Sequence, residues 1–299
     1  MPKLRKQARA PQHHKTRLSL KLTRLVFRFA GPIMPKLTSK FAYSLWFNTQ
    51  RHPRPNRENL AFESAYHKFI NMNGKRIATY TWGKNGPWVL LIHGWSGRGT
   101  QMAPFINPLL KAGYRILSFD APGHGESDGK GTSAVEIVET IAMLDKQYGP
   151  FHALITHSFG GLCAAAALHN NIAVQRAIFI AAPASLLNLL ERFAAILRLT
   201  KAIQIHMRQF AEQQFGQNIW EHMDTCKNVR NLASSGLVIH DESDRDVPWQ
   251  EGNAIAQAWP SARFIKTQRL GHRRILRDAS TISEVVGFIS ANNTDISQL

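Results

Sequence analysis

Cysteine is scarce in this chain, since Cys163 and Cys226 are the only two among 299 residues. Two cysteines cannot build the disulfide framework of a small secreted domain, and these two do not have the spacing of a metal site. The sequence therefore favours folding in a reducing compartment, and we predict a cytoplasmic location and no metal centre.

Long hydrophobic runs are also missing. No apolar stretch approaches the roughly 18 residues that a helix needs to cross a bilayer. Hydrophobic residues make up 44% of the chain and charged residues 19%, which is typical of a globular protein rather than a disordered one. A chain of 299 residues can form one large α/β domain with a substantial core, plus an extension.

Acidic residues are nearly absent from the first 60 positions, where Glu58 is the only one beside 14 lysines and arginines. The net charge of +17 therefore lies mainly in this leader, because the remaining residues contribute only +4. We predict a basic N-terminal extension over residues 1–60, which ends in a linker with Pro53 and Pro55, and a folded domain over residues 61–299.

Leucine, valine and phenylalanine alternate with arginine and lysine over Arg17–Ala30, which predicts an amphipathic basic helix. Arg24 and Arg28 interrupt the apolar residues, so a signal peptide is not expected. Two interpretations remain open for residues 17–30. The helix lies on an anionic membrane, at the inner face of the cell membrane, or it packs on the body with its basic face in water. Nucleic acid is not an expected partner, because no DNA- or RNA-binding motif accompanies the charge.

Short apolar strands alternate with helical patterns beyond the linker. Asn73-Gly74 is typical of a tight turn between two hairpin strands, 68–71 and 75–82. Further strands are predicted at Trp88–His93, Arg115–Asp120, His152–Thr156, Ala177–Ala181, Gly236–His240 and Arg263–Thr267, and a helix at Ser133–Tyr148. This order predicts an α/β fold with a mostly parallel sheet covered by helices on both faces.

The alternation breaks between Ala184 and about Val229. Helical segments at Leu186–Leu199 and Ile203–Phe215 replace the single helix expected between two parallel strands. We predict an inserted helical cap over about 184–229.

A serine stands where the strand His152–Thr156 passes into a helix of small residues. A sharp strand–turn–helix holds the nucleophilic serine of the G-x-S-x-G motif, and Ser158 occupies that place, although Thr156 replaces the first glycine. The literal motif surrounds Ser127 instead, but that serine lies between two loop segments. Context therefore selects Ser158, and we expect Thr156 to affect local packing without abolishing activity.

A serine hydroxyl needs an adjacent base, which a third group orients. The last strand is followed by Gly271-His272, at the sheet edge where sites of open α/β folds lie. We select His272 as the base over His157, which lies inside the serine turn, and over His240, which ends a buried strand.

The acid is predicted in the loop after the strand that ends at His240. Asp244 is selected because two residues separate it from Val247-Pro248, and the other position, after Ala177–Ala181, offers no carboxylate. The remaining acidic residues of this loop are expected to be solvated charges: Asp241, Glu242 and Asp246.

An acyl-transfer site also needs backbone N–H donors for the oxyanion. We predict that Phe159, after the nucleophile, and Trp95, in the glycine-rich segment that follows the strand Trp88–His93, supply them. A phosphate-binding loop is not expected at this segment, because the lysine and the Ser/Thr of a P-loop are missing.

These motifs, in this order over about residues 65 to 290, resemble those of the α/β-hydrolase superfamily, and the whole chain is similar to bacterial members with a basic leader. The resemblance implies an eight-stranded sheet, a helical cap over the site, a Ser158–Asp244–His272 triad and no cofactor. Thr156 departs from the family pattern, which usually has glycine there.

The expected activity is that of a serine hydrolase, in the carboxylesterase class, which cleaves an ester or related acyl bond of a small-molecule substrate through an acyl-enzyme. Apolar side chains in the cap indicate an apolar acyl group, or else simply pack the cap. Carbon–carbon bond hydrolases and acyltransferases use the same triad and remain alternatives, as does a non-catalytic ligand-binding protein.

Overall fold

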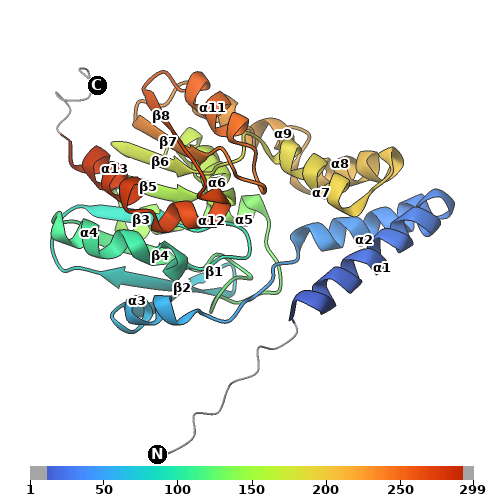
Figure 1. Ribbon diagram of the computed structural model, residues 1–299, viewed down its shortest axis with the longest axis horizontal. Coiled ribbons are helices and arrows are strands. Elements are labelled where there is room, and N and C mark those ends of the chain that lie inside the picture. The colour runs from blue at the N-terminus through green and yellow to red at the C-terminus, as the bar shows by residue number, and fades with distance from the viewer. Residues whose placement is uncertain (1–11, 292–299) are drawn as a thin grey trace, which may run out of the picture. The chain divides into compact units, whose positions relative to one another are not determined.

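The computed structural model describes the backbone of residues 12–291 and the side chains of residues 18–291 (Figure 1). Its contacts divide the chain into two compact units. Among the described residues, the smaller unit contains those up to Trp46 together with Leu190–Gly216, and the larger unit contains Phe47–Leu189 and those from Gln217 onward.

The larger unit is built on one eight-stranded sheet with the order β1-β2-β4-β3-β5-β6-β7-β8. β1 and β2 pair with each other and β2 with β4 in antiparallel fashion, whereas all other neighbours are parallel. The strands are β1 (Tyr66–Met72), β2 (Lys75–Trp82), β3 (Trp88–Ile92), β4 (Arg115–Phe119), β5 (Phe151–His157), β6 (Arg176–Ile180), β7 (Ser235–Asp241) and β8 (Ala262–Thr267). The predicted fold class, a mostly parallel eight-stranded α/β sheet, is confirmed.

The hairpin between β1 and β2 forms at the predicted turn. Asn73 and Gly74 both have positive φ, 51° and 81°, as a two-residue hairpin turn of this hand requires. The side chain of Asn71 accepts a hydrogen bond from the Gly74 N–H, which closes the turn. The local sequence therefore sets the turn that joins β1 and β2, the first two strands of the sheet.

Helices cover both faces of the sheet. α5 (Ala134–Tyr148), α6 (Phe159–His169), α10 (Thr225–Asn228) and α11 (Trp249–Ala258) contact one another in series, and α4 (Ile106–Lys111) contacts α13 (Ala279–Ser290) on the other face (Figure 1). Ser133 caps α5 and shares a reciprocal capping box with Glu136, so the helix begins where the sequence indicates.

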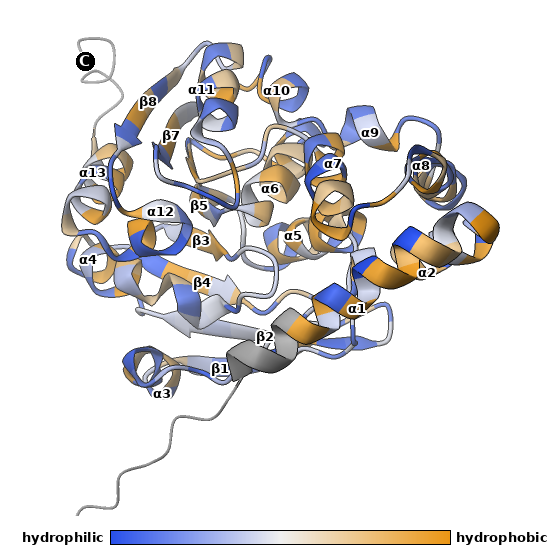
Figure 2. Ribbon diagram, turned by 45° about the vertical axis from the view of Figure 1, so that its right-hand side comes forward, coloured by the Kyte–Doolittle hydropathy of each residue, from blue (hydrophilic) through white to orange (hydrophobic). Residues whose placement is uncertain are grey.

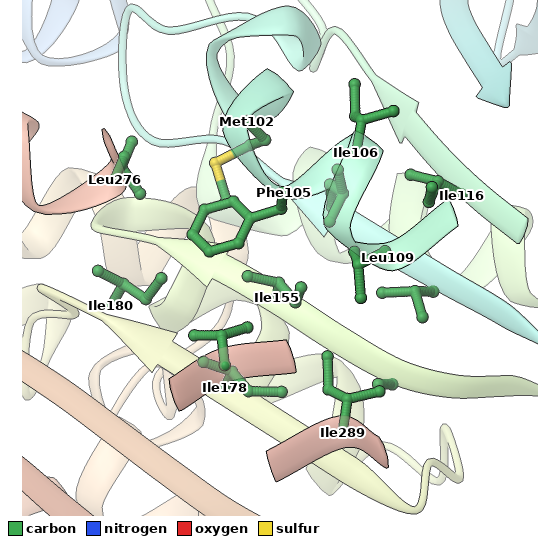
Figure 3. Packing of buried hydrophobic residues seen from close by; sticks show 14 of the residues in the cluster. Met102, Phe105, Ile106, Leu109, Ile116, Ile155, Ile178, Ile180, Leu276 and Ile289 are labelled. Carbon is green, nitrogen blue, oxygen red and sulfur yellow. The ribbon is translucent and has the colours of Figure 1, made fainter. Parts of the chain in front are cut away.

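The strands are apolar because alternate residues of the strands lie in the core under α4 and α13. Alternate strand residues, such as Ile155 and Ile178, point to this face, where Met102, Phe105 and Ile289 meet them (Figure 3). On the other face α6 contacts β3 and β5, and α11 contacts β7 and β8, so each central strand is buried on both sides.

The smaller unit is a group of packed helices. It comprises α1 (Gln12–Ile33), most of α2 (Pro35–Phe47), the later part of α7 (Leu186–Leu197) and α8 (Lys201–Phe215). Phe27 is fully buried and its ring stacks 5.6 Å from that of Phe41, while the Arg24 Nε donates to the Ile196 carbonyl at 2.7 Å. One face of α1 is thus used for packing within this unit.

The stretch between β6 and β7 consists of helices α7, α8, α9 (Ile219–His222) and α10. The boundaries 1–60 for the extension and about 184–229 for the cap stay predictions. Among the helices of residues 12–291, none combines the length and the apolar character that a membrane span requires.

Candidate active site

Ser158 occupies the tight turn between β5 and α6. Its φ of 53° and ψ of −123° place a non-glycine residue in a strained backbone conformation, and such strain collects at functional sites. Its N–H donates to the Ile180 carbonyl at 2.9 Å, and its carbonyl accepts from the Gly161 N–H at 2.8 Å. The half-buried serine faces a cavity of about 880 Å³.

Glycines let the neighbouring backbone approach this turn. A Cβ on Gly160 would lie 2.6 Å from the His93 carbonyl oxygen, and one on Gly94 would lie 2.9 Å from the Ser158 Cβ. The segment after β3, which contains Trp95, therefore passes directly beside Ser158.

Thr156 is accommodated without an unsatisfied polar group. The residue is fully buried, and its hydroxyl donates to the Ile178 carbonyl on β6 at 3.0 Å. Gly161 supplies the space for it, because a Cβ there would lie 3.1 Å from the Thr156 Oγ1. The strand–turn–helix thus forms with threonine in the place of glycine.

Ser127, which the literal motif selects, is a buried structural residue. Its Oγ donates to the Asp120 carbonyl at 2.5 Å and accepts from the Ala78 N–H at 2.9 Å. It is 1% exposed and does not line the cavity at Ser158.

Asp244 and His272 are brought together by the loops after β7 and β8. The His272 Nδ1–H donates to the Asp244 Oδ2 at 2.7 Å, which leaves the lone pair of the neutral ring on Nε2. The Asp244 carboxylate is fully buried, and its Oδ1 accepts from the N–H groups of Asp246 and Val247. Burial alone would raise the pKa of Asp244, but the hydrogen bonds from His240 and His272 hold it well below its usual range.

His240 contacts the same carboxylate, a role that the sequence did not reveal. Its Nε2 lies 3.0 Å from the Val247 carbonyl and 3.3 Å from the Asp244 Oδ2, so this nitrogen carries the proton. Gly252 provides the space, because a Cβ there would meet the His240 Nδ1 at 2.4 Å. His240 therefore helps to hold the carboxylate that His272 contacts.

The expectation that Asp241 is a solvated charge is wrong. Its buried carboxylate accepts hydrogen bonds from three backbone N–H groups and one hydroxyl, those of Ser243, Leu270, Gly271 and Thr267. Burial opposes its ionisation, but the backbone donors outweigh burial and lower the pKa of Asp241. Asp241 thus ties the Asp244 loop to the His272 loop, while Glu242 and Asp246 are exposed as expected.

His157, passed over as the base, links the serine turn to the His272 loop. Its Nε2–H donates to the His272 carbonyl at 2.8 Å, and the two rings lie 4.8 Å apart. Burial lowers the pKa of His157 to about 3, so the ring stays neutral.

Two further buried histidines hold the segment after β3. The His93 Nε2 accepts from the Ala121 N–H at 3.0 Å, so its Nδ1–H donates to the Gly94 carbonyl at 2.7 Å. The His124 Nε2 accepts from the Ser96 N–H at 2.9 Å. Burial lowers the pKa of His93 to about 4 and that of His124 to about 3, which keeps both acceptor nitrogens unprotonated.

The two predicted oxyanion donors lie on the segments just described. The Trp95 ring packs edge-on against the Phe159 ring at 5.0 Å. Within residues 12–291 neither the Trp95 N–H nor the Phe159 N–H donates a hydrogen bond. Over the side chains described, no group of three or more His, Cys, Asp or Glu residues is arranged to hold a metal.

The fold and the sequence together identify the protein family to which this chain belongs. The profile of the alpha/beta hydrolase family matches residues 89–284, and the chain belongs to this family. The expectation drawn from the motifs is confirmed, and the protein is a hydrolase whose relatives include esterases.

Individual relatives are distant in sequence but match over most of their length. A pimeloyl-[acyl-carrier protein] methyl ester esterase of Xanthomonas axonopodis pv. citri is 28% identical over 243 residues, which cover 68% of this chain and 94% of that protein. Mouse alpha/beta hydrolase domain-containing protein 10 shares the fold with a TM-score of 0.61 at 18% identity, over 75% of this chain and 97% of its own. A solved structure described as a membrane phospholipase A matches with a TM-score of 0.60 at 17% identity, over 95% of this chain and 100% of its own.

Proposed function

We propose that this hydrolase cleaves carboxylic esters through an acyl-enzyme, with Ser158 as nucleophile, His272 as general base and Asp244 as the orienting acid. The observation that carries the proposal is the hydrogen bond between the His272 Nδ1 and a buried Asp244, beside the cavity that Ser158 lines. The name of the Xanthomonas relative, a methyl ester esterase, supports the same reaction class.

In the first half-reaction the Ser158 Oγ attacks the ester carbonyl carbon while the His272 Nε2 takes the hydroxyl proton. Asp244 stabilises the resulting imidazolium through Nδ1. The N–H groups of Trp95 and Phe159 bind the oxyanion, and each such donor is worth about 3 kcal/mol in the transition state. The ester C–O bond then breaks, and His272 returns the proton to the leaving alkoxide.

In the second half-reaction water attacks the acyl-enzyme. His272 removes a proton from the water, the acid leaves, and the proton returns to the Ser158 Oγ. Both polar and apolar side chains line the cavity. The apolar ones include Leu60, Ile106 and Leu276, which can contact the acyl chain.

A panel of methyl and p-nitrophenyl esters tests this proposal. We expect Ser158→Ala to lower kcat by at least about 10⁴-fold, because the nucleophile and the base act as a unit. Ser64→Ala is the matched control, since Ser64 is an exposed serine that lines the same cavity, and it should keep parental activity. If Ser158→Ala retains activity within tenfold of the parent, the nucleophile is assigned to the wrong residue.

We further propose that α1 and α2 contact an anionic membrane surface, and a stripe of exposed apolar side chains supports this. The stripe follows the helical spacing on the side of α1 opposite the buried Phe27, and hydrophobic and hydrophilic segments alternate along both helices (Figure 2). Phe29 is 64% exposed and Ile33 80%. The stripe consists of Leu18, Leu22, Leu25, Val26, Phe29 and Ile33 on α1, with Met34 in the bend and Leu37 and Phe41 on α2.

The positive charge of α1 and α2 also favours an anionic membrane as the partner. Lys21, Arg28, Lys36 and Lys40 are exposed on these helices, and the sequence has no acidic residue before Glu58. A basic residue near an anionic surface contributes about 1 kcal/mol, and buried apolar side chains add to this. The neighbour that matches 95% of the chain is described as a membrane phospholipase A, which supports the proposal.

Vesicle co-sedimentation tests this contact. The parent should bind vesicles of phosphatidylglycerol and phosphatidylcholine, and less so as salt rises. Leu22→Glu combined with Phe29→Glu should abolish binding without unfolding the protein, because both side chains are exposed. Tyr66→Glu, at an exposed aromatic position on β1, is the control. Equal binding of the double variant and the parent would contradict the proposal.

A further inference from the structure

The cavity at Ser158 has more positive than negative side chains. Four arginines line it, together with two carboxylates, those of Glu58 and Asp246. The arginines are Arg57, Arg98, Arg273 and Arg277. An excess of cations beside a reactive serine favours substrates that carry negative charge.

Two of these arginines, Arg57 and Arg98, lie beside one carboxylate, that of Glu58. The Arg98 Nε donates to the Glu58 Oε2 at 2.7 Å, and a second nitrogen donates to the His52 carbonyl. The Arg57 guanidinium lies 4.0 Å from the same, nearly buried carboxylate. The negative charge of Glu58 thus offsets part of the positive charge of Arg57 and Arg98 on this side of the cavity.

The other two arginines have no such partner. Within the described residues, neither Arg273 nor Arg277 makes an ion pair or a side-chain hydrogen bond. Their neighbour Arg274 differs, since its guanidinium donates to the carbonyls of Leu270 and Arg269 and so holds the loop. Two guanidinium groups therefore border the cavity with all their donors available.

The two free arginines border the same cavity from neighbouring segments. They belong to the consecutive short helical segments α12 (Gly271–Arg274) and η3 (Ile275–Arg277), and both line the cavity that Ser158 lines. Arg273 directly follows His272, and its charge is close enough to contribute to the lowered pKa of the buried His157.

We infer that Arg273 and Arg277 form a subsite for an anionic group of the substrate, a carboxylate or a phosphate, while Ser158 acts on the ester. The guanidinium fork suits either anion, because it can donate two parallel hydrogen bonds to two oxygens. The inference rests on the proposed esterase function and names the substrate class for it. The substrate is then an ester that carries an acidic group remote from the bond that is cleaved.

Kinetics on paired substrates test the subsite. The first pair compares monomethyl esters of dicarboxylic acids with methyl esters of monocarboxylic acids of equal length, over a series of lengths. The second pair compares an acyl thioester of pantetheine with that of 4′-phosphopantetheine. If the enzyme prefers the monomethyl ester of the dicarboxylic acid, the anionic group is a carboxylate on the acyl side. If it prefers the 4′-phosphopantetheine thioester, the anionic group is a phosphate on the leaving group.

For the preferred anionic substrate we expect Arg273→Ala and Arg277→Ala each to raise KM about tenfold, as loss of a charge-assisted hydrogen bond would. kcat/KM on the neutral partner should stay within twofold in both variants. Arg277→Glu should reverse the preference within the pair. Arg230→Ala, which removes an exposed charge outside the cavity lining, is the control and should change neither substrate.

Failure of the subsite differs from failure of the esterase function. If the parent hydrolyses neutral and anionic partners equally, or if the arginine variants lose activity on both alike, the subsite inference is wrong while the esterase stands. If no ester or thioester is hydrolysed at all, the proposed function itself is contradicted.

Discussion

Asp244 receives more hydrogen bonds than its partnership with His272 requires. His240 lies 3.3 Å away on the same oxygen that His272 contacts, and two backbone N–H groups hold the other oxygen. The carboxylate is therefore fixed in position and in charge before any substrate binds, which is the preorganisation that acid–base catalysis needs.

We expect Asp244→Asn to lower kcat for ester hydrolysis by about 10⁴-fold with little change in structure, because an amide no longer selects the tautomer with its proton on Nδ1. Glu242→Gln, at an exposed position of the same loop, should leave kcat unchanged. Steady-state kinetics on one p-nitrophenyl ester measure both. An Asp244→Asn enzyme within tenfold of the parent would show that the acid lies elsewhere.

Thr156 is a second test at the scale of single residues. Because its buried hydroxyl bonds to the Ile178 carbonyl, we expect Thr156→Val to cost about 1 kcal/mol in the free energy of unfolding. Thr156→Gly should cost about 2–3 kcal/mol, since it also removes packing and stiffness. Both variants should keep kcat within about threefold, measured beside urea unfolding. A tenfold higher kcat in Thr156→Gly would mean that the threonine misplaces Ser158.

At the scale of elements, Asp241 joins the two loops that carry the predicted acid and base. We expect Asp241→Asn to lower the free energy of unfolding by about 3 kcal/mol, because an amide places N–H groups against backbone donors. kcat should fall as well, since the distance between Asp244 and His272 depends on this junction. Urea unfolding and ester kinetics measure the two effects, again with Glu242→Gln as control. Loss of stability at unchanged kcat would contradict the positioning role.

The elements themselves were largely predictable. Residues that favour positive φ or helix capping mark where the elements turn or begin. Asn73-Gly74 marks the hairpin turn, and Ser133 with Glu136 marks the start of α5. Central strands were evident because burial on both faces makes them continuously apolar. The candidate nucleophile and base also followed from their places after strands.

The supporting groups of the site could not be found in the same way. His93 and His124 each accept from a backbone N–H 28 positions distant along the chain, and His240 contacts Asp244 and Val247 across a loop, so only tertiary contacts define their roles. Asp241 was taken for a solvated charge because three of its four donors come from a neighbouring loop and strand end, and sequence spacing does not reveal such burial.

At the scale of the whole molecule, three buried neutral histidines should make the protein sensitive to acid. The pKa values of His93, His124 and His157 are lowered to about 4, 3 and 3, whereas the unfolded chain protonates these rings near pH 6.5. The unfolded state therefore binds more protons below pH 6.5, and stability falls as pH decreases from there toward the folded values. Each histidine contributes a slope of about 1.4 kcal/mol per pH unit within that window.

Urea unfolding at pH 7.5, 6, 5 and 4 measures this loss. We expect His157→Gln, which keeps an N–H donor but cannot titrate, to lose less stability per pH unit than the parent. His169→Gln, at an exposed position, should keep the parental slope. Parallel slopes for all three proteins would contradict the role of the buried ring.

Labelling of the intact protein with a fluorophosphonate, followed by peptide mapping, tests the central claim most directly, because this reagent phosphonylates a serine that a neighbouring base activates. We expect a single adduct on Ser158 and none on the buried Ser127. His272→Ala should suppress the labelling, and Ser158→Ala should abolish it. An adduct on Ser127, or labelling of Ser158→Ala at the parental rate, would contradict the assignment of Ser158 as the nucleophile.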